Sequence, residues 1–497
     1  MNRGLTRREF LRSAGGITFL ALAPVGRGLF AASADSLPTF TALPYVQPGG
    51  SGTLTPGRES MRLLWQTSRQ PAEFALNYGA DESCGQIARI ERAERLDGGA
   101  GHFNYTATLD GLSPGKRYLY EVKCNGALLA KGYLTTRQPR GERVRFAAFG
   151  DNSYGGPSDH AIAFQAYQAH PDFIMNTGDN VYQSGLDGEY ARYFFPVYNA
   201  DVPGSRLGAP LLRSVPFYSV LANHDVRRTG PAGGPAADFS KDPDSLGFYT
   251  NFHLPLNGPD PAQPTPILGP DGLLDAFRAC AGARFPRMAN YSYDYGDIHF
   301  LCLDSNLYVN PSDPALQSWV ENDLSGTDAR WKFVVYHHPC FNVGHEHWEE
   351  QQMRVLCPLL EKHGVDFVLS GHEHNYQRTR PLRFQPGDAA KAAAINEKDR
   401  QVGGAFTVDR AFDGTANTRP DGILYITTGA GGNTLYDADY NNNPSKWRLP
   451  GDPDYVVRMV SDRHSLTVFD IDGNSLLMRQ IDEFGHEIDR LSVAKKG

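Results

Sequence analysis

Five short apolar runs in the middle of this chain each end abruptly in polar groups suited to binding metal ions. They span residues 144–149, 173–175, 215–221, 333–336 and 365–369. Runs this short and this apolar are typical of buried central strands in a layered α/β domain. In open α/β sheets, ligands bind beyond the carboxyl ends of the strands. We therefore expect the polar groups that follow the five runs to gather at one rim.

The residues that follow these runs are carboxylates, histidines, an asparagine and a tyrosine. A carboxylate can bridge two cations through its two oxygens, whereas a phenolate is a rarer ligand that prefers a hard ion such as Fe(III). In isolation Asp151 and Asp179 are better explained as loop acids that cap a helix, but five such endings in one domain are improbable by chance. The set predicts a two-metal cage with Asp151, Asp179, Tyr182, Asn223, His337, His372 and His374 as candidate ligands.

Length and charge restrict the class of protein. A chain of 497 residues predicts two or three compact units. The net charge of −8 and the pI of about 6.0 argue against a nucleic-acid binder and against a polybasic membrane-surface protein. We therefore expect a soluble globular protein without a nucleic-acid partner.

The N-terminus has the pattern of an export signal. Arg7 and Arg8 precede a mildly apolar run at residues 15–25 and a small-x-small sequence at residues 32–34. Residues 1–34 thus resemble a twin-arginine signal peptide, and the mature chain is expected to begin near Asp35. A short anchor helix is the weaker alternative, because a membrane span needs roughly 20 apolar residues. We expect a periplasmic or secreted protein that has no membrane span in its mature form and uses the twin-arginine translocation machinery.

The cysteines exclude two kinds of scaffold. The chain has six of them, at positions 84, 124, 280, 302, 340 and 357, and no C-x-x-C pair. They are too sparse for a disulfide framework, and a thiolate zinc site is not expected. One or two disulfides remain open in an oxidising compartment, but the pairing cannot be read from the sequence.

Residues 37–137 have the alternating pattern of short strands separated by turns. The Leu-Ser-Pro-Gly turn at residues 112–115 leads into a strand with Tyr118 and Tyr120 at alternate positions, which resembles a fibronectin type III module. No cluster of catalytic groups occurs there. We expect a β-sandwich, followed by a polar linker at residues 135–143.

Beyond the linker, apolar runs alternate with amphipathic segments. Helices are expected at residues 158–170, with Ser158 as N-cap, and at 316–324 and 349–363, where Pro358 argues against one continuous helix. Long loops are expected at 227–272 and 383–421, and a hairpin at 464–470 and 475–481. The glycine-rich residues 429–432 favour a tight turn over a phosphate cradle.

The order of these motifs resembles the calcineurin-like metallophosphoesterases, and Tyr182 with His372 and His374 resembles their purple acid phosphatase branch. The resemblance covers residues 144–490, and a preceding fibronectin-like domain also fits that branch. It implies an all-β fibronectin III-like sandwich followed by an α/β catalytic domain of βαβαβ type, a four-layer sheet sandwich.

The resemblance also implies roles for the ligands. Asp151, Tyr182 and His374 would hold a first metal, typically Fe(III). Asn223, His337 and His372 would hold a second, divalent Fe, Zn or Mn, and Asp179 would bridge the two. His338 stands next to His337, and only one of the two is expected to be a ligand.

Two residues depart from the family pattern. Ser153 and Ala222 stand where the family usually has glycine, and both put the geometry of the loops in question. PhoD-like alkaline phosphatases carry Trp-Asp-Asp-His near the third motif, which does not occur in this chain.

The implied chemistry is phosphate-ester hydrolysis. Two cations roughly 4 Å apart give a bridging hydroxide near neutral pH, which attacks in line with the leaving group. Histidine is the usual donor of a proton to the departing oxygen. By position, His224 would contact the phosphate and His347 would be the acid, with His345 as a further candidate.

Three functions follow from this pattern. The first is a phosphomonoesterase, an acid phosphatase. The second is a phosphodiesterase acting on cyclic nucleotides or glycerophosphodiesters, and the two long loops would decide between them. The third is a secreted binding protein with a vestigial metal site, against which the complete ligand set argues. Substrate, exact metal pair and oligomeric state cannot be read from the sequence.

Overall fold

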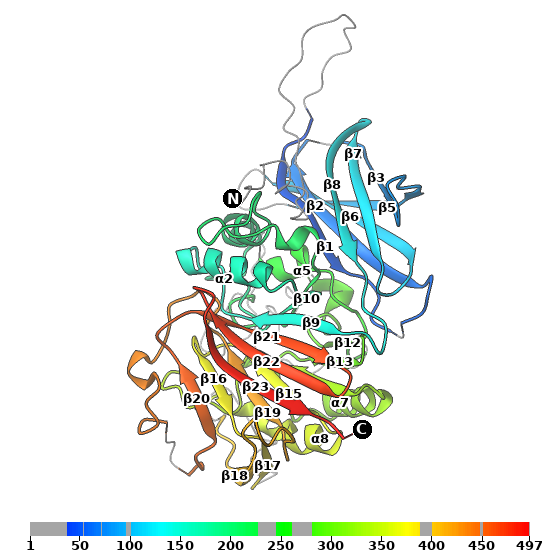
Figure 1. Ribbon diagram of the computed structural model, residues 1–497. Helices are drawn as coiled ribbons and strands as arrows, with labels where there is room; N and C mark the ends of the chain where they lie inside the picture. The colour runs from blue at the N-terminus through cyan, green and yellow to red at the C-terminus, as the bar shows by residue number, and fades with distance from the viewer. Residues whose placement is uncertain are drawn as a thin grey trace, which may run out of the picture.

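The computed structural model describes residues 37–52, 54–70, 72–95, 101–226, 245–260, 281–387, 400–447 and 451–496. The expected export signal, Cys280 and large parts of the two expected long loops lie outside these residues. Within the described part, no helix is long and apolar enough to cross a membrane. A β-rich N-terminal part rests on a larger part of mixed strands and helices (Figure 1).

The N-terminal part is built from two four-stranded antiparallel sheets. One has the order β1 (Phe40–Pro48), β2 (Glu59–Ser68), β6 (His102–Leu112), β5 (Arg89–Arg95), and the other β4 (Gln86–Ile87), β3 (Phe74–Gly79), β7 (Arg117–Cys124), β8 (Ala127–Thr135). Along β7 every second residue is buried, as the tyrosine alternation predicts. The hydroxyl of Tyr118 accepts a hydrogen bond from the N–H of Ser113 in the preceding turn (3.0 Å). The N-terminal part is thus β-rich, and both its bounds as a domain and its fibronectin III-like character stay predictions.

Buried polar contacts fix the sandwich to the larger part. The Arg137 guanidinium pairs with Glu59 (3.0 Å from Nε to Oε2) and also donates to the carbonyl of Asp294 (2.9 Å). The Gln66 amide donates to the side-chain oxygen of Asn251 (2.6 Å), and both side chains are buried. Because these bonds are shielded from water, they hold the two parts together more firmly than surface pairs would.

The larger part contains two sheets whose strands carry the five apolar runs. The six-stranded sheet has the order β11 (Phe217–Ser219), β10 (Phe173–Asn176), β9 (Val144–Phe149), β21 (Ser465–Asp472), β22 (Ser475–Asp482), β23 (Glu487–Ala494). The seven-stranded sheet has the order β12 (Tyr291–Tyr295), β13 (Ile298–Cys302), β14 (Trp331–Val335), β15 (Phe367–Ser370), β19 (Leu424–Thr428), β16 (Tyr376–Thr379), β20 (Val456–Val460). The five runs therefore end in two sheets, three in one and two in the other, and not along a single sheet.

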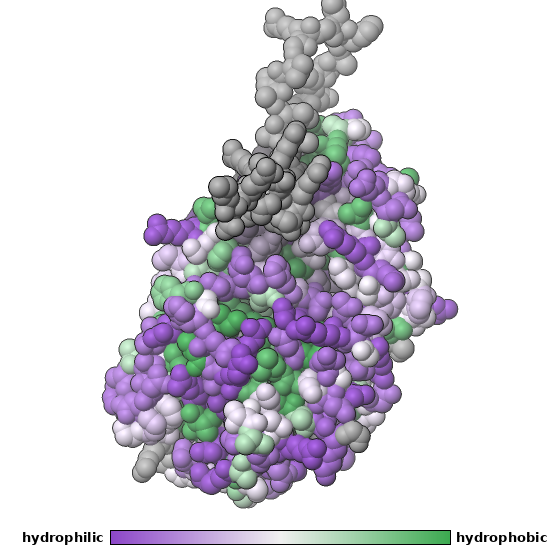
Figure 2. Space-filling model, in the orientation of Figure 1, coloured by the Kyte–Doolittle hydropathy of each residue, from purple (hydrophilic) through white to green (hydrophobic). Residues whose placement is uncertain are grey.

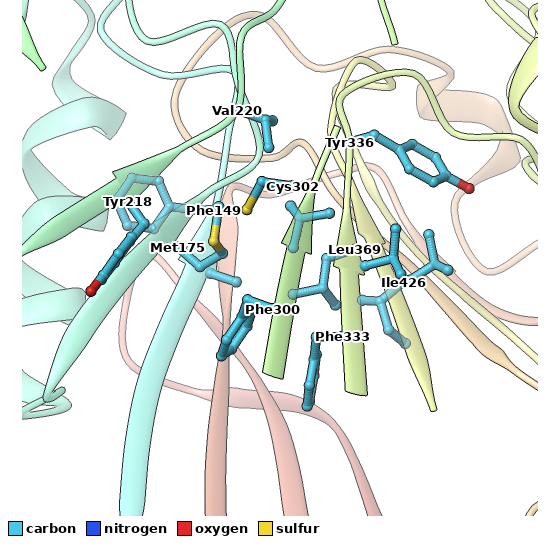
Figure 3. Packing of buried hydrophobic residues seen from close by; sticks show 14 of the residues in the cluster. Phe149, Met175, Tyr218, Val220, Phe300, Cys302, Phe333, Tyr336, Leu369 and Ile426 are labelled. Carbon is cyan, nitrogen blue, oxygen red and sulfur yellow. The ribbon is translucent and has the colours of Figure 1, made fainter. Parts of the chain in front are cut away.

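The two sheets share one hydrophobic core. Phe146 of β9 stacks on Phe173 and Phe469 of its own sheet, with ring centroids 5.1 and 4.7 Å away. Its edge meets Phe300 and Phe333 of the other sheet at 5.2 and 5.4 Å. Figure 3 shows side chains of the two sets of strands pointing into this common layer. Facing sheets packed through aromatic rings bring the strand ends of both to one place.

The helices refine the expected boundaries. The first, α2 (Pro157–Gln168), has Gly156 as N-cap, so the assignment of Ser158 as cap was wrong. Proline takes the first helical position, and the carboxylate of Asp159 accepts the N–H groups of Ser153, Gly155 and Gly156 (2.8–3.0 Å). The segment 349–363 splits into η4 (Gln352–Leu356) and α8 (Cys357–Lys362), with Pro358 in the first turn of α8. The helix expected at 316–324 is α7 (Pro314–Gly326), capped by Asp313.

Shorter elements complete the described part. They are α3 (Asp187–Glu189), η1 (Tyr190–Phe194), α4 (Phe195–Tyr198), η2 (Leu211–Arg213), α5 (Gly247–Asn251), η3 (Gly282–Arg284), η5 (Ala438–Tyr440) and the hairpin β17 (Leu382–Pro386) with β18 (Gly404–Val408). The expected C-terminal hairpin is β21 with β22, and β23 extends it by a third strand. On the face drawn in Figure 2, hydrophilic side chains predominate and hydrophobic ones show through in separate areas of the larger part.

A buried histidine gives the fold a pH dependence of its own. The two ring nitrogens of His299 on β13 each lie 2.8 Å from a carboxylate oxygen, of Asp294 and of Asp323. Burial lowers the pKa of His299, but the two hydrogen-bonded carboxylates outweigh burial and raise it to about 9. An imidazole with a raised pKa stabilises the fold fully below its unfolded value of about 6.5, and this contribution is lost as the pH rises through about 9.

We expect the unfolding free energy of the wild type to fall by roughly 3 kcal/mol between pH 6.5 and pH 9.5 from this residue alone. The His299→Gln variant should lack that component, because glutamine does not titrate. Urea unfolding of both proteins across this pH range measures the difference. Parallel curves for the two proteins would contradict the expectation.

Candidate metal centre

The seven expected ligands come from loops at the carboxyl ends of strands in both sheets. In the six-stranded sheet, Asp151 follows β9, Asp179 and Tyr182 follow β10, and Asn223 follows β11. In the seven-stranded sheet, His337 follows β14, and His372 and His374 follow β15. All seven are buried, none with more than 8% of its surface exposed. Because the sheets face each other, the two groups of loops meet above the shared core.

One group of ligand atoms surrounds the hydroxyl of Tyr182. The Tyr182 oxygen lies 3.3 Å from Oδ1 of Asp151, 3.1 Å from Oδ2 of Asp179 and 3.2 Å from Nε2 of His374. Nε2 of His374 is also 3.5 Å from Oδ1 of Asp151. Oxygen and nitrogen atoms at these separations match the edges of a coordination polyhedron with bonds of about 2 Å.

A second group shares Asp179 with the first. Nε2 of His337 lies 3.4 Å from Oδ2 of Asp179 and 3.2 Å from Nδ1 of His372. Ligand atoms of these three residues lie within 4.8 Å of one another. Asp179 therefore stands between the Tyr182 group and the His337 group, in the place that a bridging carboxylate would need.

Two features indicate that these residues fit a pair of cations. The side-chain oxygen of Asn223 is buried and has no hydrogen-bond partner among the described residues, which is unusual for a buried amide. In addition, Nδ1 of His337 lies 2.8 Å from the carbonyl of Thr177, and Nδ1 of His374 lies 2.7 Å from that of Thr434. Each Nδ1 therefore donates its proton to a carbonyl, which leaves the Nε2 lone pair directed into the site.

The loops that carry these ligands have a strained backbone. Asp151, Asp179 and His372 have φ angles of 58°, 51° and 68°, in the left-handed region that residues with a side chain seldom adopt. Such conformations cost roughly 1 kcal/mol or more each and cluster at functional sites. Ser153, one of the two departures from the family pattern, has a φ of 59° and so takes the conformation that a glycine would adopt.

Ala222, the other departure, packs beside a true glycine. A Cβ atom added at Gly178 would lie 2.6 Å from Cβ of Ala222 and 2.8 Å from Nδ1 of His337. Gly178 has a φ of 99° and is therefore required on both conformational and steric grounds. The methyl group of Ala222 is accommodated because its neighbour has none.

The glycine-rich turn after β19 packs behind the ligands. A Cβ at Gly429 would lie 2.7 Å from Oδ2 of Asp151, and a Cβ at Gly431 would lie 2.1 Å from the carbonyl of Gly150. The N–H of Gly431 donates to that same carbonyl (3.0 Å). These contacts agree with the expected tight turn, which packs against the loop that carries Asp151.

Sequence reasoning missed Asp225, which organises the loops from the inside. Its carboxylate accepts the N–H groups of Asp179, Asn180 and Ala222 (3.1–3.2 Å) and the hydroxyl of Tyr190 (3.2 Å). Burial, reinforced by the nearby charge of Asp179, raises the pKa of Asp225 to about 8. The sequence does contain a signal for this role, because an acid stands two residues after Asn223 at the end of the same apolar run.

The three candidate catalytic histidines differ in position. The N–H of His224 donates to Oδ1 of Asp179 (2.8 Å), and its ring lies 4.5 Å from that of Tyr182, centroid to centroid. The ring of His347 lies 3.9 Å from that of His372. His345 is exposed, and its N–H donates to Asp437 (2.9 Å). The structure therefore brings His224 and His347 to the ligands and leaves His345 closer to solvent.

Fold and site together define a two-sheet domain with a cluster of buried metal-binding side chains at its strand ends. Residues 144–376 match the calcineurin-like phosphoesterase family. This part of the chain is therefore similar to calcineurin-like phosphoesterases, and that similarity implies a dinuclear metal centre. The expected resemblance to purple acid phosphatases is supported by relatives in sequence and in structure.

Among sequence relatives, purple acid phosphatase 17 of Arabidopsis thaliana is 28% identical over 270 residues, which cover 50% of this chain and 69% of that protein. A protein described as probable inactive purple acid phosphatase 27, also from A. thaliana, is 24% identical over 84% of this chain and 62% of its own length.

Two solved structures share the fold. The purple acid phosphatase PPD1 from yellow lupin seeds has a TM-score of 0.61 at 15% identity, covering 91% of this chain and 74% of that one. PhoD has a TM-score of 0.57 at 14% identity, covering 92% and 94%. The expected metallophosphoesterase fold is thus confirmed.

Proposed function

We propose that this protein hydrolyses phosphate monoesters at a dinuclear metal centre of the purple acid phosphatase type. The observation that carries the proposal is the position of Tyr182, whose oxygen lies within 3.3 Å of Asp151, Asp179 and His374. A phenolate in a cage of carboxylates and imidazoles suits Fe(III), with a divalent Fe, Zn or Mn ion beside it. Asp151, Tyr182 and His374 would hold the first ion, Asn223, His337 and His372 the second, and Asp179 both.

The chain's own residues would perform three tasks. Bound cations supply Lewis-acid activation of water and of the phosphoryl group. Asp179 fixes the backbone of His224 through the N–H that it accepts (2.8 Å), so that the His224 ring is held over the site. His347 packs against His372 and would give a proton to the leaving oxygen. The third task is to hold the cations, which falls to the seven buried ligands.

Metal content and an absorption spectrum of the purified protein test the proposal. We expect two metal ions per chain in the cage and a visible charge-transfer band from Tyr182 to Fe(III), which the Tyr182→Phe variant should lose. A panel of phosphomonoesters and phosphodiesters then ranks the substrates, and faster turnover of diesters would favour the phosphodiesterase alternative. A folded, colourless protein without metal would instead favour a non-catalytic binding protein. At least one relative of this chain is itself described as probably inactive.

The His347→Ala variant separates proton donation from metal binding. We expect turnover to fall by roughly 10²–10⁴-fold, the usual contribution of a general acid. Metal content should stay unchanged, because His347 packs on the ring of His372 and is not itself one of the seven expected ligands. Turnover with esters of good leaving groups, which need no proton, should fall much less. Loss of metal in this variant would instead make His347 a ligand.

We also propose export by the twin-arginine route, on the strength of Arg7 and Arg8 before the apolar run. Export of a folded chain would let the protein acquire its metals before it meets competing ions. The double substitution of Arg7 and Arg8 by lysine should retain the protein in the cytoplasm. Fractionation of cells that express each form measures this, and equal export of both would contradict the proposal.

A further inference from the structure

A second group of potential ligand atoms lies on the other side of His372. His338, Glu350 and His372 each offer one atom, and these atoms lie within 4.8 Å of one another. Nε2 of His372 is 2.9 Å from Oε2 of Glu350, and Nε2 of His338 is 3.7 Å from the same oxygen. The three side chains come from the loop after β14, the loop after β15 and the segment before η4.

The three atoms are buried, and two of them form a close pair. Nε2 of His372 lies at ion-pair distance from Oε2 of Glu350, whereas Nε2 of His338 has no hydrogen-bond partner among the described residues. The side chains of His338 and His372 are only 0% and 7% exposed. Buried polar atoms are normally paired, so the unpaired Nε2 of His338, 3.7 Å from the same carboxylate oxygen, indicates a missing ligand.

This group uses a different nitrogen of His372 from the dinuclear cage. Nδ1 of His372 faces His337 (3.2 Å), whereas Nε2 faces Glu350. The orientation of His338 is fixed independently, because its Nδ1 lies 2.9 Å from the hydroxyl of Ser305, which also accepts the backbone N–H of His338. Nε2 of His338 is thereby left free to point at Glu350.

We propose that His338, Glu350 and His372 bind a further divalent cation of the zinc type, outside the dinuclear cage. Two imidazole nitrogens and one carboxylate oxygen are a zinc donor set, and a tetrahedral site with bonds of about 2.1 Å separates its ligand atoms by about 3.4 Å. The separations of 2.9 and 3.7 Å bracket that value. Binding displaces the proton of His372 Nε2 to solvent, so that His372 carries a cation on each nitrogen. His338 thus becomes a ligand, although the sequence led us to expect only one of the two adjacent histidines in this role.

A cation at this position would connect the segment that carries His347 with the dinuclear cage. Nδ1 of His347 lies 3.7 Å from Oε1 of Glu350, and the ring of His347 rests on that of His372. A cation held by Glu350 therefore clamps the segment that carries His347 against a ligand of the dinuclear centre.

The test counts metal ions in the full-length folded protein, independently of activity. Protein stripped with a chelator is titrated with Zn²⁺ alone, and bound zinc per chain is measured by mass spectrometry after desalting. The variants are His338→Gln and Glu350→Gln, which keep size and remove a ligand atom, and the matched control is Glu349→Gln at the adjacent, exposed position. Circular dichroism confirms that each variant is folded.

We expect three zinc ions per chain in the wild type and in Glu349→Gln, and two in His338→Gln and in Glu350→Gln. Anomalous diffraction at the zinc edge should place the third ion between His338 and Glu350. Two ions in all four proteins would overturn this inference, since Glu350 would then only orient His372, and would leave the dinuclear proposal standing. A wild type that is folded and binds no zinc would overturn both.

Discussion

The Asp179→Ala variant is expected to lose at least three orders of magnitude in turnover together with the metals of the cage. Oδ2 of Asp179 lies 3.1 Å from the Tyr182 oxygen and 3.4 Å from Nε2 of His337, so the same carboxylate oxygen belongs to both groups of ligands. Alanine removes a ligand from each cation at once and leaves their mutual repulsion without a bridging charge. A loss of only 4 kcal/mol in transition-state stabilisation already amounts to about 10³-fold in rate.

The measurement combines steady-state kinetics on a phosphomonoester with metal analysis of the same preparation. Asp304→Ala is the matched control, because Asp304 is an equally buried acid at the end of β13 whose carboxylate accepts from Asn306 and Tyr308. The control should lose stability and keep its metals. An Asp179→Ala protein that retained full metal content and turnover would show that the cage does not depend on a bridge, and the proposed function would fail with it.

The position of Asp179 also shows why local patterns predict this site well. Each ligand follows one of the five apolar runs, and the local sequence is enough to locate the carboxyl end of a buried strand. The pattern does not say which strands pair. In the six-stranded sheet, β21 (residues 465–472) pairs antiparallel with β9 (residues 144–149). More than 300 positions separate these two strands in the chain. The apolar runs alone therefore predict one rim but do not show that two sheets build it, which only the resemblance to a four-layer sheet sandwich implied.

Residues that act through others were the ones that sequence reasoning missed. Asp225 closes the same apolar run as Asn223, but its role and that of Glu350 depend on which backbone N–H groups or imidazoles the fold brings to them. The misplaced cap of α2 has the same origin. Ser158 is a good cap by residue type, but Pro157 fixes the start of the helix and the carboxylate of Asp159 takes the preceding N–H groups. The residue types of a segment predict that a helix forms there, and the neighbouring residues decide where that helix begins.

The second large effect concerns the layer between the two sheets. The Phe146→Ala variant is expected to lower the unfolding free energy by about 3–5 kcal/mol, the usual cost of removing a fully buried phenylalanine. The Phe146 ring meets aromatic rings of both sheets, with four centroid separations between 4.7 and 5.4 Å. A cavity at this point cannot be filled by movement of one sheet alone, because the rings on each side are held by their own strands.

Urea unfolding in the presence of a chelator measures this effect, because bound metals would add stability of their own. Phe484→Ala is the control, since that ring is 69% exposed and its loss should change the free energy by about 0.5 kcal/mol or less. A shift below 1 kcal/mol for Phe146→Ala would mean that the sheets do not depend on each other for stability. The expected shift has a consequence for the cage, because β9 continues directly into the loop of Asp151. Looser contact between the sheets would separate the ligands of one from those of the other, so metal affinity should fall in this variant although the substitution lies in the core and removes no ligand.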